Sequence, residues 1–113
     1  MLRIIEPRFP HIEADVIAAW RAIPTAIISD ERNRGGTMAA AIKPVAPGLG
    51  FAGEALTVKT MVADNLALHH AAAMAWPGAA IVIDAGSHLD HAVWGELLHL
   101  TATKRGVVGI VID

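Results

Sequence analysis

The sequence predicts an α/β fold in which helices pack against a buried parallel sheet. Two uninterrupted apolar runs, AAIVID (79–84) and VVGIVID (107–113), have the composition of strands that are buried on both faces. A helical pattern ended by Gly106 separates them, so we expect parallel strands joined by a right-handed crossover. The residues are 54% hydrophobic but only 4% aromatic, which suits close packing of small side chains.

Two helices are expected in the first third of the chain. Apolar residues at helical spacing predict a helix over 12–23 that stops at Pro24, with acidic residues in its first turn, where they complement the helix dipole. Thr25 is expected to cap a short second helix, AIISDERN (26–33), which the Gly35-Gly36 pair then ends.

Extended segments are expected to follow these helices. The runs AAAIKPVA (39–46) and GEALTVKTMV (53–62) flank a turn rich in proline and glycine, and we expect them to be neighbouring strands. Asp64 is placed to cap a helix over 65–76, which Pro77-Gly78 closes. We also expect a helix before the last strand, because apolar and small residues recur there at the i, i+3, i+4, i+7, i+8 spacing of an amphipathic helix: Trp94, Leu97, Leu98, Thr101 and Ala102.

Length, charge and cysteine usage limit the class of protein. The 113 residues predict one domain, 1–113, and the apolar content predicts self-association. A formal net charge of -2 with scattered charges gives no footprint for nucleic acid or an anionic membrane. The chain has no cysteine and no signal-like start, so we expect a cytoplasmic protein. The predicted strand at 107–113 runs to the end of the given sequence, and we expect the domain to be incomplete.

The candidate site is the segment Gly95-Glu96-Leu97-Leu98, at the start of a helix. Ligands of open parallel sheets lie beyond the carboxyl ends of the strands, and the first turn of a helix offers unpaired N–H groups to an anion. Gly95 would let a ligand approach the backbone, and the amides through Leu98 could hold a carboxylate or phosphate while both leucines turn into the core. The simpler interpretation is an ordinary helix start whose acid favours the dipole.

Five segments together resemble one known family. It contains the regulator of ribonuclease activity A and the 4-hydroxy-4-methyl-2-oxoglutarate aldolases, and TAIISD (25–30) matches it more weakly. The segments occur in the family's order and spacing: GEALTV (53–58), DNLALHHA (64–71), PGAAIVIDAG (77–86), AVWGELL (92–98) and RGVVGIVID (105–113).

The resemblance implies a compact α/β/α sandwich of the ribonuclease-regulator-like type, here without its C-terminal part. Such proteins assemble as homotrimers with the active site at a subunit boundary. The enzymes among them are pyruvate aldolases that depend on a divalent cation, Mg²⁺ or Mn²⁺. They cleave 4-hydroxy-4-methyl-2-oxoglutarate or similar 2-oxoacids and decarboxylate oxaloacetate.

The resemblance also assigns roles to residues. Glu96 would be the catalytic acid that orients metal-bound water, and the amides at Gly95, Leu97 and Leu98 would bind the pyruvyl carboxylate. The family's Arg-Asp pair, which supplies the direct metal ligand and stabilises the enolate, follows the acid after twenty residues. It would fall at positions 117 and 118, beyond the given sequence. We therefore expect the 113-residue chain to lack aldolase activity.

Secondary candidates lie near the same predicted edge. Asp64 and Asn65 would either cap a helix or shape the pocket, and Asp84 would face the ligand crevice or satisfy the loop backbone. His91, with His88 and Asp90, would bind a metal ion or be solvated loop residues.

Two further sites are predicted to be structural. The adjacent His69 and His70 point in different directions on a helix, which favours packing or a supporting hydrogen bond over joint chelation. Trp94 is expected to anchor the core or an interface.

The leading functional hypothesis is therefore a metal-dependent lyase of small 2-oxoacids. The alternative is a regulator that binds and inhibits an endoribonuclease, because fold alone does not separate these two classes. A third possibility is a fragment that does not fold by itself, given the apolar strand surface that it would leave uncovered.

Overall fold

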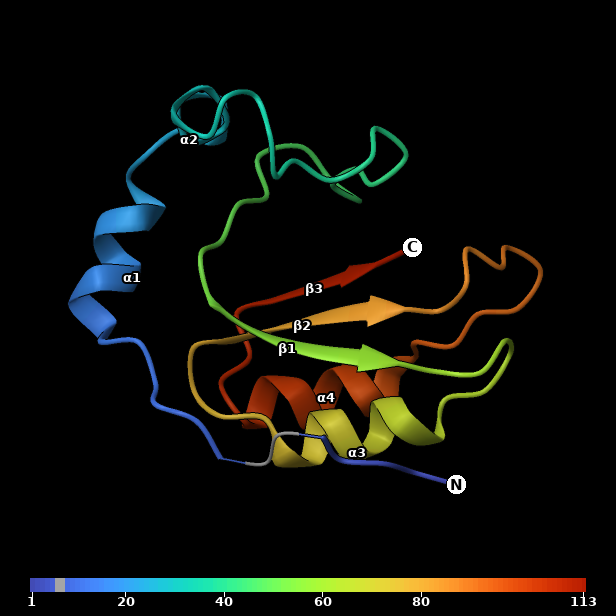
Figure 1. The fold of residues 1–113 in the computed structure, drawn as a ribbon. Coiled ribbons are helices and arrows are strands. Elements are labelled where there is room, and N and C mark those ends of the chain that lie inside the picture. Colours follow the sequence, from blue (N-terminus) through green and yellow to red (C-terminus); the bar gives the residue numbers. More distant parts are fainter. Residues whose placement is uncertain (6–7) are drawn as a thin grey trace.

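The computed structural model describes residues 1–5 and 8–113 (Figure 1). Helices and strands alternate in its second half, as the sequence predicts. The elements are α1 (Ala14–Arg21), α2 (Thr25–Glu31), β1 (Glu54–Lys59), α3 (Leu66–Met74), β2 (Ala79–Asp84), α4 (Glu96–Lys104) and β3 (Gly109–Ile112).

The strands form one parallel sheet in the order β1-β2-β3. Glu54 pairs with Ala79 at one end of the β1–β2 ladder and Lys59 with Asp84 at the other. The predicted α/β class and the parallel pairing of the last two strands are confirmed. All three strands end at one edge of the sheet, the carboxyl edge.

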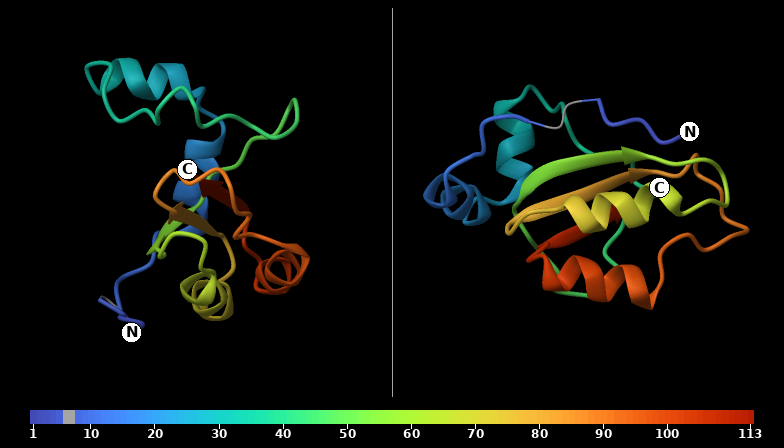
Figure 2. Two further views of the ribbon diagram at one scale, coloured as in Figure 1. Left: turned by 90° about the vertical axis from the view of Figure 1, so that its right-hand side faces the viewer. Right: turned by 90° about the horizontal axis from the view of Figure 1, so that it is seen from below.

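Both crossover helices lie on one face of the sheet (Figure 2). Each strand is added on the same side of its predecessor, and parallel crossovers have a fixed hand, so α3 and α4 must cover the same face. A second helical layer, as in a full sandwich, is not seen over residues 1–5 and 8–113. It would need strands added beyond β1, in the opposite direction.

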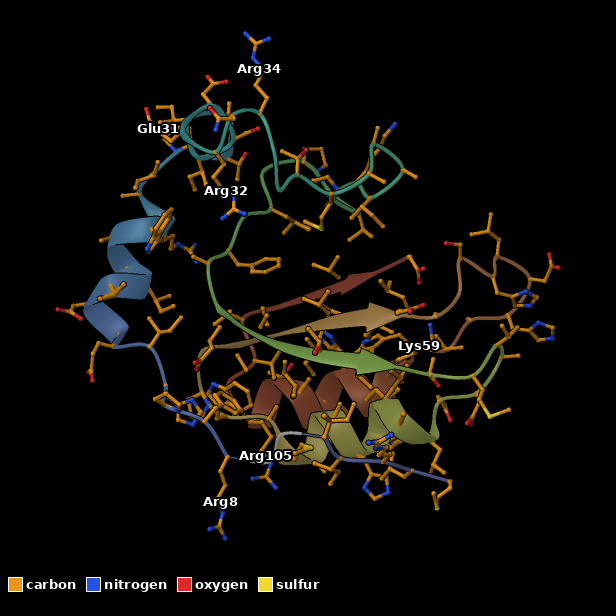
Figure 3. The ribbon with its side chains drawn as sticks, viewed as in Figure 1. Arg8, Glu31, Arg32, Arg34, Lys59 and Arg105 are labelled. Carbon is orange, nitrogen blue, oxygen red and sulfur yellow. The ribbon has the colours of Figure 1, made fainter. Side chains whose placement is uncertain are left out.

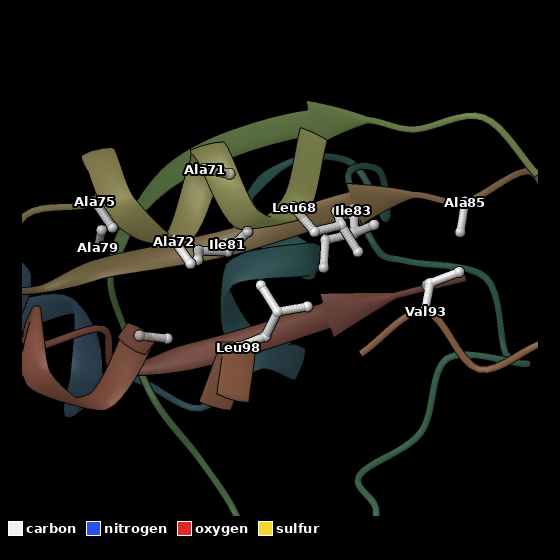
Figure 4. Packing of buried hydrophobic residues seen from close by; sticks show 11 residues of the cluster. Leu68, Ala71, Ala72, Ala75, Ala79, Ile81, Ile83, Ala85, Val93 and Leu98 are labelled. Carbon is white, nitrogen blue, oxygen red and sulfur yellow. The ribbon is translucent and has the colours of Figure 1, made fainter. Parts of the chain in front are cut away.

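The core lies between β2 and the two crossover helices (Figure 4). Ile81 and Ile83 point from the central strand towards Leu68 on α3 and Leu98 on α4, and Ile81, Leu68 and Leu98 are fully buried. Alanines of α3, α4 and β2 fill the remaining space, which lets the helices approach the sheet closely. The core is thus packed with small side chains, as the low aromatic content of the sequence predicts.

The first half of the chain differs from its prediction at two points. Residues 39–46 form no strand, and β1 instead pairs with β2. Met38 and Ile42 lie over the sheet face opposite the helices, beside Val82 and Val111. The apolar run therefore lies across a cavity from the sheet without pairing with it, and all of its residues except Ile42 are exposed. Pro44, which has no N–H, fits that arrangement.

The start and end of α2 also differ. Pro24 takes the position before the helix, and Thr25 is already helical with no capping hydrogen bond from a side chain. The chain reverses at Asn33 and Arg34, both at positive φ (54° and 61°), rather than at the glycine pair. Arg34 donates its amide to the Ser29 carbonyl at 2.7 Å, which closes the helix end.

Neither α1 nor α2 has a buried residue. The apolar side chains whose spacing predicts the first helix, such as Val16 and Trp20, are exposed.

The helices are also short. The longest, α3 and α4, have only nine residues each, whereas a helix that crosses a bilayer needs about 20. No helix in the described part of the chain is long and apolar enough to cross a membrane.

Glu54 ties the N-terminal segment to the start of β1. Its side chain, 13% exposed, accepts hydrogen bonds from the Trp76 indole at 3.0 Å and the Ile12 amide at 3.2 Å, and pairs with His11 Nδ1 at 2.8 Å. Phe9 packs against both the His11 and the Trp76 ring. The His11 hydrogen bond, with those of Ile12 and Trp76, holds the pKa of Glu54 below its ordinary value.

Two adjacent leucines on α4 test this description of the core. Leu98→Ala should lower the free energy of unfolding by about 2–5 kcal/mol, because Leu98 is 2% exposed and its removal leaves a cavity. Leu97→Ala should change it by no more than about 0.5 kcal/mol, because Leu97 is 75% exposed. Urea denaturation of both variants measures the difference. Equal effects, or no cooperative transition in the parent chain, would contradict the described packing.

Candidate functional site

Most of the candidate residues lie at the carboxyl edge of the sheet. The three strands end there, and α3 and α4 both begin there (Figure 1). Parallel strands joined by crossover helices always place strand ends and helix starts together, which is why ligands of such sheets bind at this edge. Glu96, Asp64 and Asp84 all lie on this side of the molecule.

The start of α4 has unpaired backbone amides. Among the described residues, no acceptor bonds the amides of Gly95 through Leu98, and the helix has no side-chain cap. Its first backbone bond runs from the His99 amide to the Gly95 carbonyl at 3.0 Å. The Glu96 side chain is exposed in this first turn. These N–H groups are therefore free to bind an anion.

Gly95 is not required by the fold. Its backbone is extended (φ -137°, ψ -176°), a conformation that any residue adopts, and a Cβ added there would meet nothing within 4 Å. Gly106, at the other end of α4, differs: its φ is +78° and an added Cβ would lie 3.0 Å from Pro77. The open space at Gly95 is where a ligand could approach the main chain.

One predicted orientation at this helix start is wrong. Leu97 does not turn into the core but is 75% exposed, whereas Leu98 is buried as expected. The helix is covered by the sheet on one side only, so residues one position apart cannot both face it. The partly buried Trp94 packs against the core cluster, as an anchor.

A charged pair joins the ends of β1 and β2. Lys59 Nζ donates to Asp84 Oδ2 at 2.7 Å, and both side chains are exposed. Lys59 lies at the end of β1 (Figure 3). Asp84 Oδ1 also accepts the Gly86 amide at 3.1 Å. The mutual hydrogen bond lowers the pKa of Asp84 and raises the pKa of Lys59. Asp84 thus satisfies the loop backbone, one of its two predicted roles.

Asp113 holds the start of the loop between β2 and α4. Its Oδ1 accepts the Ala85 amide at 2.6 Å, and its Oδ2 accepts the amide and the hydroxyl of Ser87, both at 3.0 Å. Ser87 has a positive φ of 52°, and these bonds stabilise that conformation. They lower the pKa of Asp113, with the Ala85 bond as the largest cause. The carboxylate fixes this loop against β3.

Asp64 is occupied by the start of α3. Its Oδ1 accepts the Leu66 amide at 3.2 Å, and its carbonyl accepts the Thr60 hydroxyl at 2.7 Å. Asn65 takes the position before the helix and makes no capping bond. The prediction that Asp64 caps the helix is therefore not met: Asn65 holds the cap position, and Asp64 makes a turn contact two residues along the chain that leads into the helix.

The histidine candidates separate into two groups. His88 Nε2 and His91 Nδ1 lie 2.8 Å apart in the loop before α4. His69 and His70 are both exposed on α3, which contradicts packing, one of the two roles predicted for them; the other was a supporting hydrogen bond. No group of three or more histidine, aspartate or glutamate side chains suited to a metal ion occurs among the described residues.

Two cavities lie near this edge. The first, about 700 Å³, lies between the N-terminal segment, β1 and α3, and His70 and Asp64 are in its wall. The second, about 580 Å³, lies on the sheet face opposite the helices and includes Lys59, Asp84 and Asp113. Neither is lined by residues 95–98, so the unpaired amides open to solvent in this chain.

The structure thus brings together Asp84 and two residues that sequence reasoning missed, Lys59 and Asp113. The signal was present, because each directly ends a strand or follows one, as Asp84 does, and parallel strand ends are neighbours. Glu96 and Asp64 share the edge with them, without a direct hydrogen bond among the described residues.

The fold and its carboxyl edge place the chain among α/β proteins with a parallel sheet. The family model described as "RraA-like: Aldolase/RraA" matches residues 25–113. The chain belongs to this family.

One relative extends the comparison. A protein of Halalkalibacterium halodurans named "Putative 4-hydroxy-4-methyl-2-oxoglutarate aldolase" is 37% identical over 101 residues, which are 89% of this chain and 48% of the relative. The chain therefore spans about half the length of that relative.

Replacement of Asp113 by asparagine tests the loop contact. A carboxyl with a lowered folded-state pKa stabilises the fold above its ordinary value, about 4, and this stabilisation is lost as the pH falls through the lower folded value. In the parent chain, the Ala85 and Ser87 amide resonances should therefore titrate below pH about 4. Asp113→Asn should abolish that titration and speed hydrogen exchange at both amides.

The exposed Asp90, which makes no hydrogen bond among the described residues, supplies the control. Asp90→Asn should leave the two amides unchanged. An ordinary pKa for Asp113, or unaltered exchange in Asp113→Asn, would show that the loop is held by other contacts.

Proposed function

We propose that this chain is the pyruvate-binding part of a divalent-metal-dependent lyase. The whole protein would cleave 4-hydroxy-4-methyl-2-oxoglutarate or a similar 2-oxoacid to pyruvate and would decarboxylate oxaloacetate. Membership of the Aldolase/RraA family and the name of the relative from H. halodurans support a lyase. The assembly would be a homotrimer, which is an expectation from the resemblance alone.

The observation that carries the proposal is the uncapped start of α4. At α4 the amides from Gly95 to Leu98 have no acceptor among the described residues, and they lie beside the open space at Gly95. At the start of α3, by comparison, the Asp64 carboxylate accepts one amide, that of Leu66. The carboxylate of a 2-oxoacid can accept from these N–H groups, and the partial positive charge of the helix start favours it.

Glu96 is the side chain placed to move a proton. It follows Gly95 directly and is exposed beside the free amides, so a substrate held by those amides would lie within its reach. A positioned carboxyl can transfer a proton to or from a reacting carbon or bound water. In the proposed reaction, Glu96 would protonate the pyruvate enolate through water after the carbon–carbon bond breaks.

The described residues do not complete a metal site by themselves. Mg²⁺ and Mn²⁺ prefer oxygen ligands, but Asp84 is engaged by Lys59 and Asp113 by the loop amides. Glu96 alone remains as a free carboxylate near the unpaired amides, and one carboxylate does not fix the position of a cation. The proposed cation would polarise the 2-oxo group, with its direct ligand at position 118.

The alternative function is protein-mediated inhibition of an endoribonuclease. The family description names both classes, while the name of the relative favours the enzyme. Tight binding to a ribonuclease that does not respond to metal, without pyruvate release, would favour the regulator.

Gly95→Ala separates a binding role from a folding role. The added methyl meets no neighbour, so the free energy of unfolding should stay the same or rise by up to about 1 kcal/mol. Pyruvate should shift the Gly95–Leu98 amide resonances in the parent chain, and the variant should bind it at least tenfold more weakly. Unchanged affinity would show that the ligand does not approach this backbone. Gly106→Ala, which should destabilise the fold, is the contrasting control.

The proposed reaction is tested with the chain and with its extension through positions 117 and 118. The 113-residue chain should release no pyruvate from oxaloacetate above a no-protein control with added magnesium. The extended protein should release it in a magnesium-dependent manner, and Glu96→Gln should lower kcat by about 10²–10⁴-fold. Activity of the short chain, or full activity of Glu96→Gln, would overturn the assigned roles.

A further inference from the structure

The loop of residues 85–95 carries a feature that the proposed lyase does not use. Both ends of this loop are fixed: Asp113 binds Ala85 and Ser87 at one end, and Val93, 8% exposed, is buried in the core cluster at the other. Between these attachments the loop projects beyond the carboxyl edge of the sheet (Figure 1). His88 and His91 lie in this projecting part.

The two imidazoles face each other. His88 Nε2 and His91 Nδ1 are 2.8 Å apart, and the rings are almost parallel, with an interplanar angle of 15° and centroids 5.1 Å apart. At this separation one nitrogen donates a hydrogen to the lone pair of the other. The two ring nitrogens therefore point at a common position between them.

We propose that His88 and His91 form a binding site for a borderline transition-metal cation, of which Zn²⁺ is the representative. Imidazole nitrogen binds Zn²⁺ at about 2.0–2.1 Å, so two nitrogens on one tetrahedral ion lie about 3.4 Å apart. To admit the ion, the observed pair must open by about half an ångström and both rings must turn so that their lone pairs meet at the ion. When the cation binds, the hydrogen between the rings moves to the other nitrogen of the imidazole that carries it, so both histidines remain neutral ligands and each gives one lone pair to the ion.

The fixed loop ends favour this binding. A cation that gathers two histidines from a mobile segment must also order that segment, which weakens binding. Here the nitrogens already lie together, and His88 is partly buried while His91 is exposed, so the ion has access from solvent. Water completes the coordination, since the described residues contain no group of three ligating side chains. We therefore expect a labile site.

This site is distinct from the proposed catalytic cation site. Nitrogen donors suit zinc, nickel and copper, whereas Mg²⁺ prefers oxygen ligands. The inference does not rest on the lyase proposal, since it requires neither Glu96 nor the amides at Gly95.

The other histidines serve as internal comparisons. His11 is already paired with Glu54 at 2.8 Å. His69 and His70 are adjacent on α3 and project in different directions. His99 is exposed on α4 and has no side-chain partner among the described residues, which makes it the matched control.

The test is a Zn²⁺ titration of the untagged, metal-free chain, followed by calorimetry and by the imidazole resonances of the histidines. The parent should bind one equivalent, with the His88 and His91 resonances shifted most. His88→Ala and His91→Ala should each lower the affinity at least tenfold, and His99→Ala should leave it unchanged. Mg²⁺ should not compete.

Thermal melts of the metal-free parent and variants are the control for folding. The melting temperatures should agree, because substitutions in this projecting loop should not change the fold. No saturable binding by the parent, or equal affinity in the His88 and His91 variants, overturns the proposal. Gly95→Ala should bind Zn²⁺ normally even though it binds pyruvate weakly, so failure of one inference is distinguishable from failure of the other.

Discussion

Parallel pairing of three short strands is the constraint on which the rest of this structure depends. Parallel neighbours cannot be joined by a tight turn, so each connection needs a crossover, and its fixed hand puts α3 and α4 on one face. The same constraint brings three strand ends and two helix starts to one edge. The core and the candidate site are thus two consequences of one topology.

The two helix starts at that edge are treated differently. Asp64 satisfies the first amide of α3 from within the chain, and the carboxylates of Asp84 and Asp113 are likewise engaged by neighbouring groups. The amides at the start of α4 are left without a protein acceptor among the described residues. The ligand role proposed for Gly95 rests on these free amides together with the open space beside Gly95, where an added Cβ would meet nothing within 4 Å.

Sequence patterns predicted the helices and the three paired strands but wrongly predicted a strand at residues 39–46, for a physical reason. Residues 79–84 and 96–104 bury side chains against each other, so their periodicity records the fold directly. Residues 39–46 are apolar but mostly exposed across a cavity from the sheet, and composition alone does not distinguish such a segment from a strand that joins the sheet. The contacts of Lys59 and Asp113 depend on strand register, which only the paired structure supplies.

Asp113 also gives the fold an order of assembly. Its bonds to Ala85 and Ser87 span 28 and 26 residues of sequence, and they can form only after β3 has paired with β2. Contacts of long sequence separation form late, because closing the intervening chain opposes them. The loop therefore becomes ordered in the same step that completes the sheet, and its ordering during refolding reports when the last strand has docked.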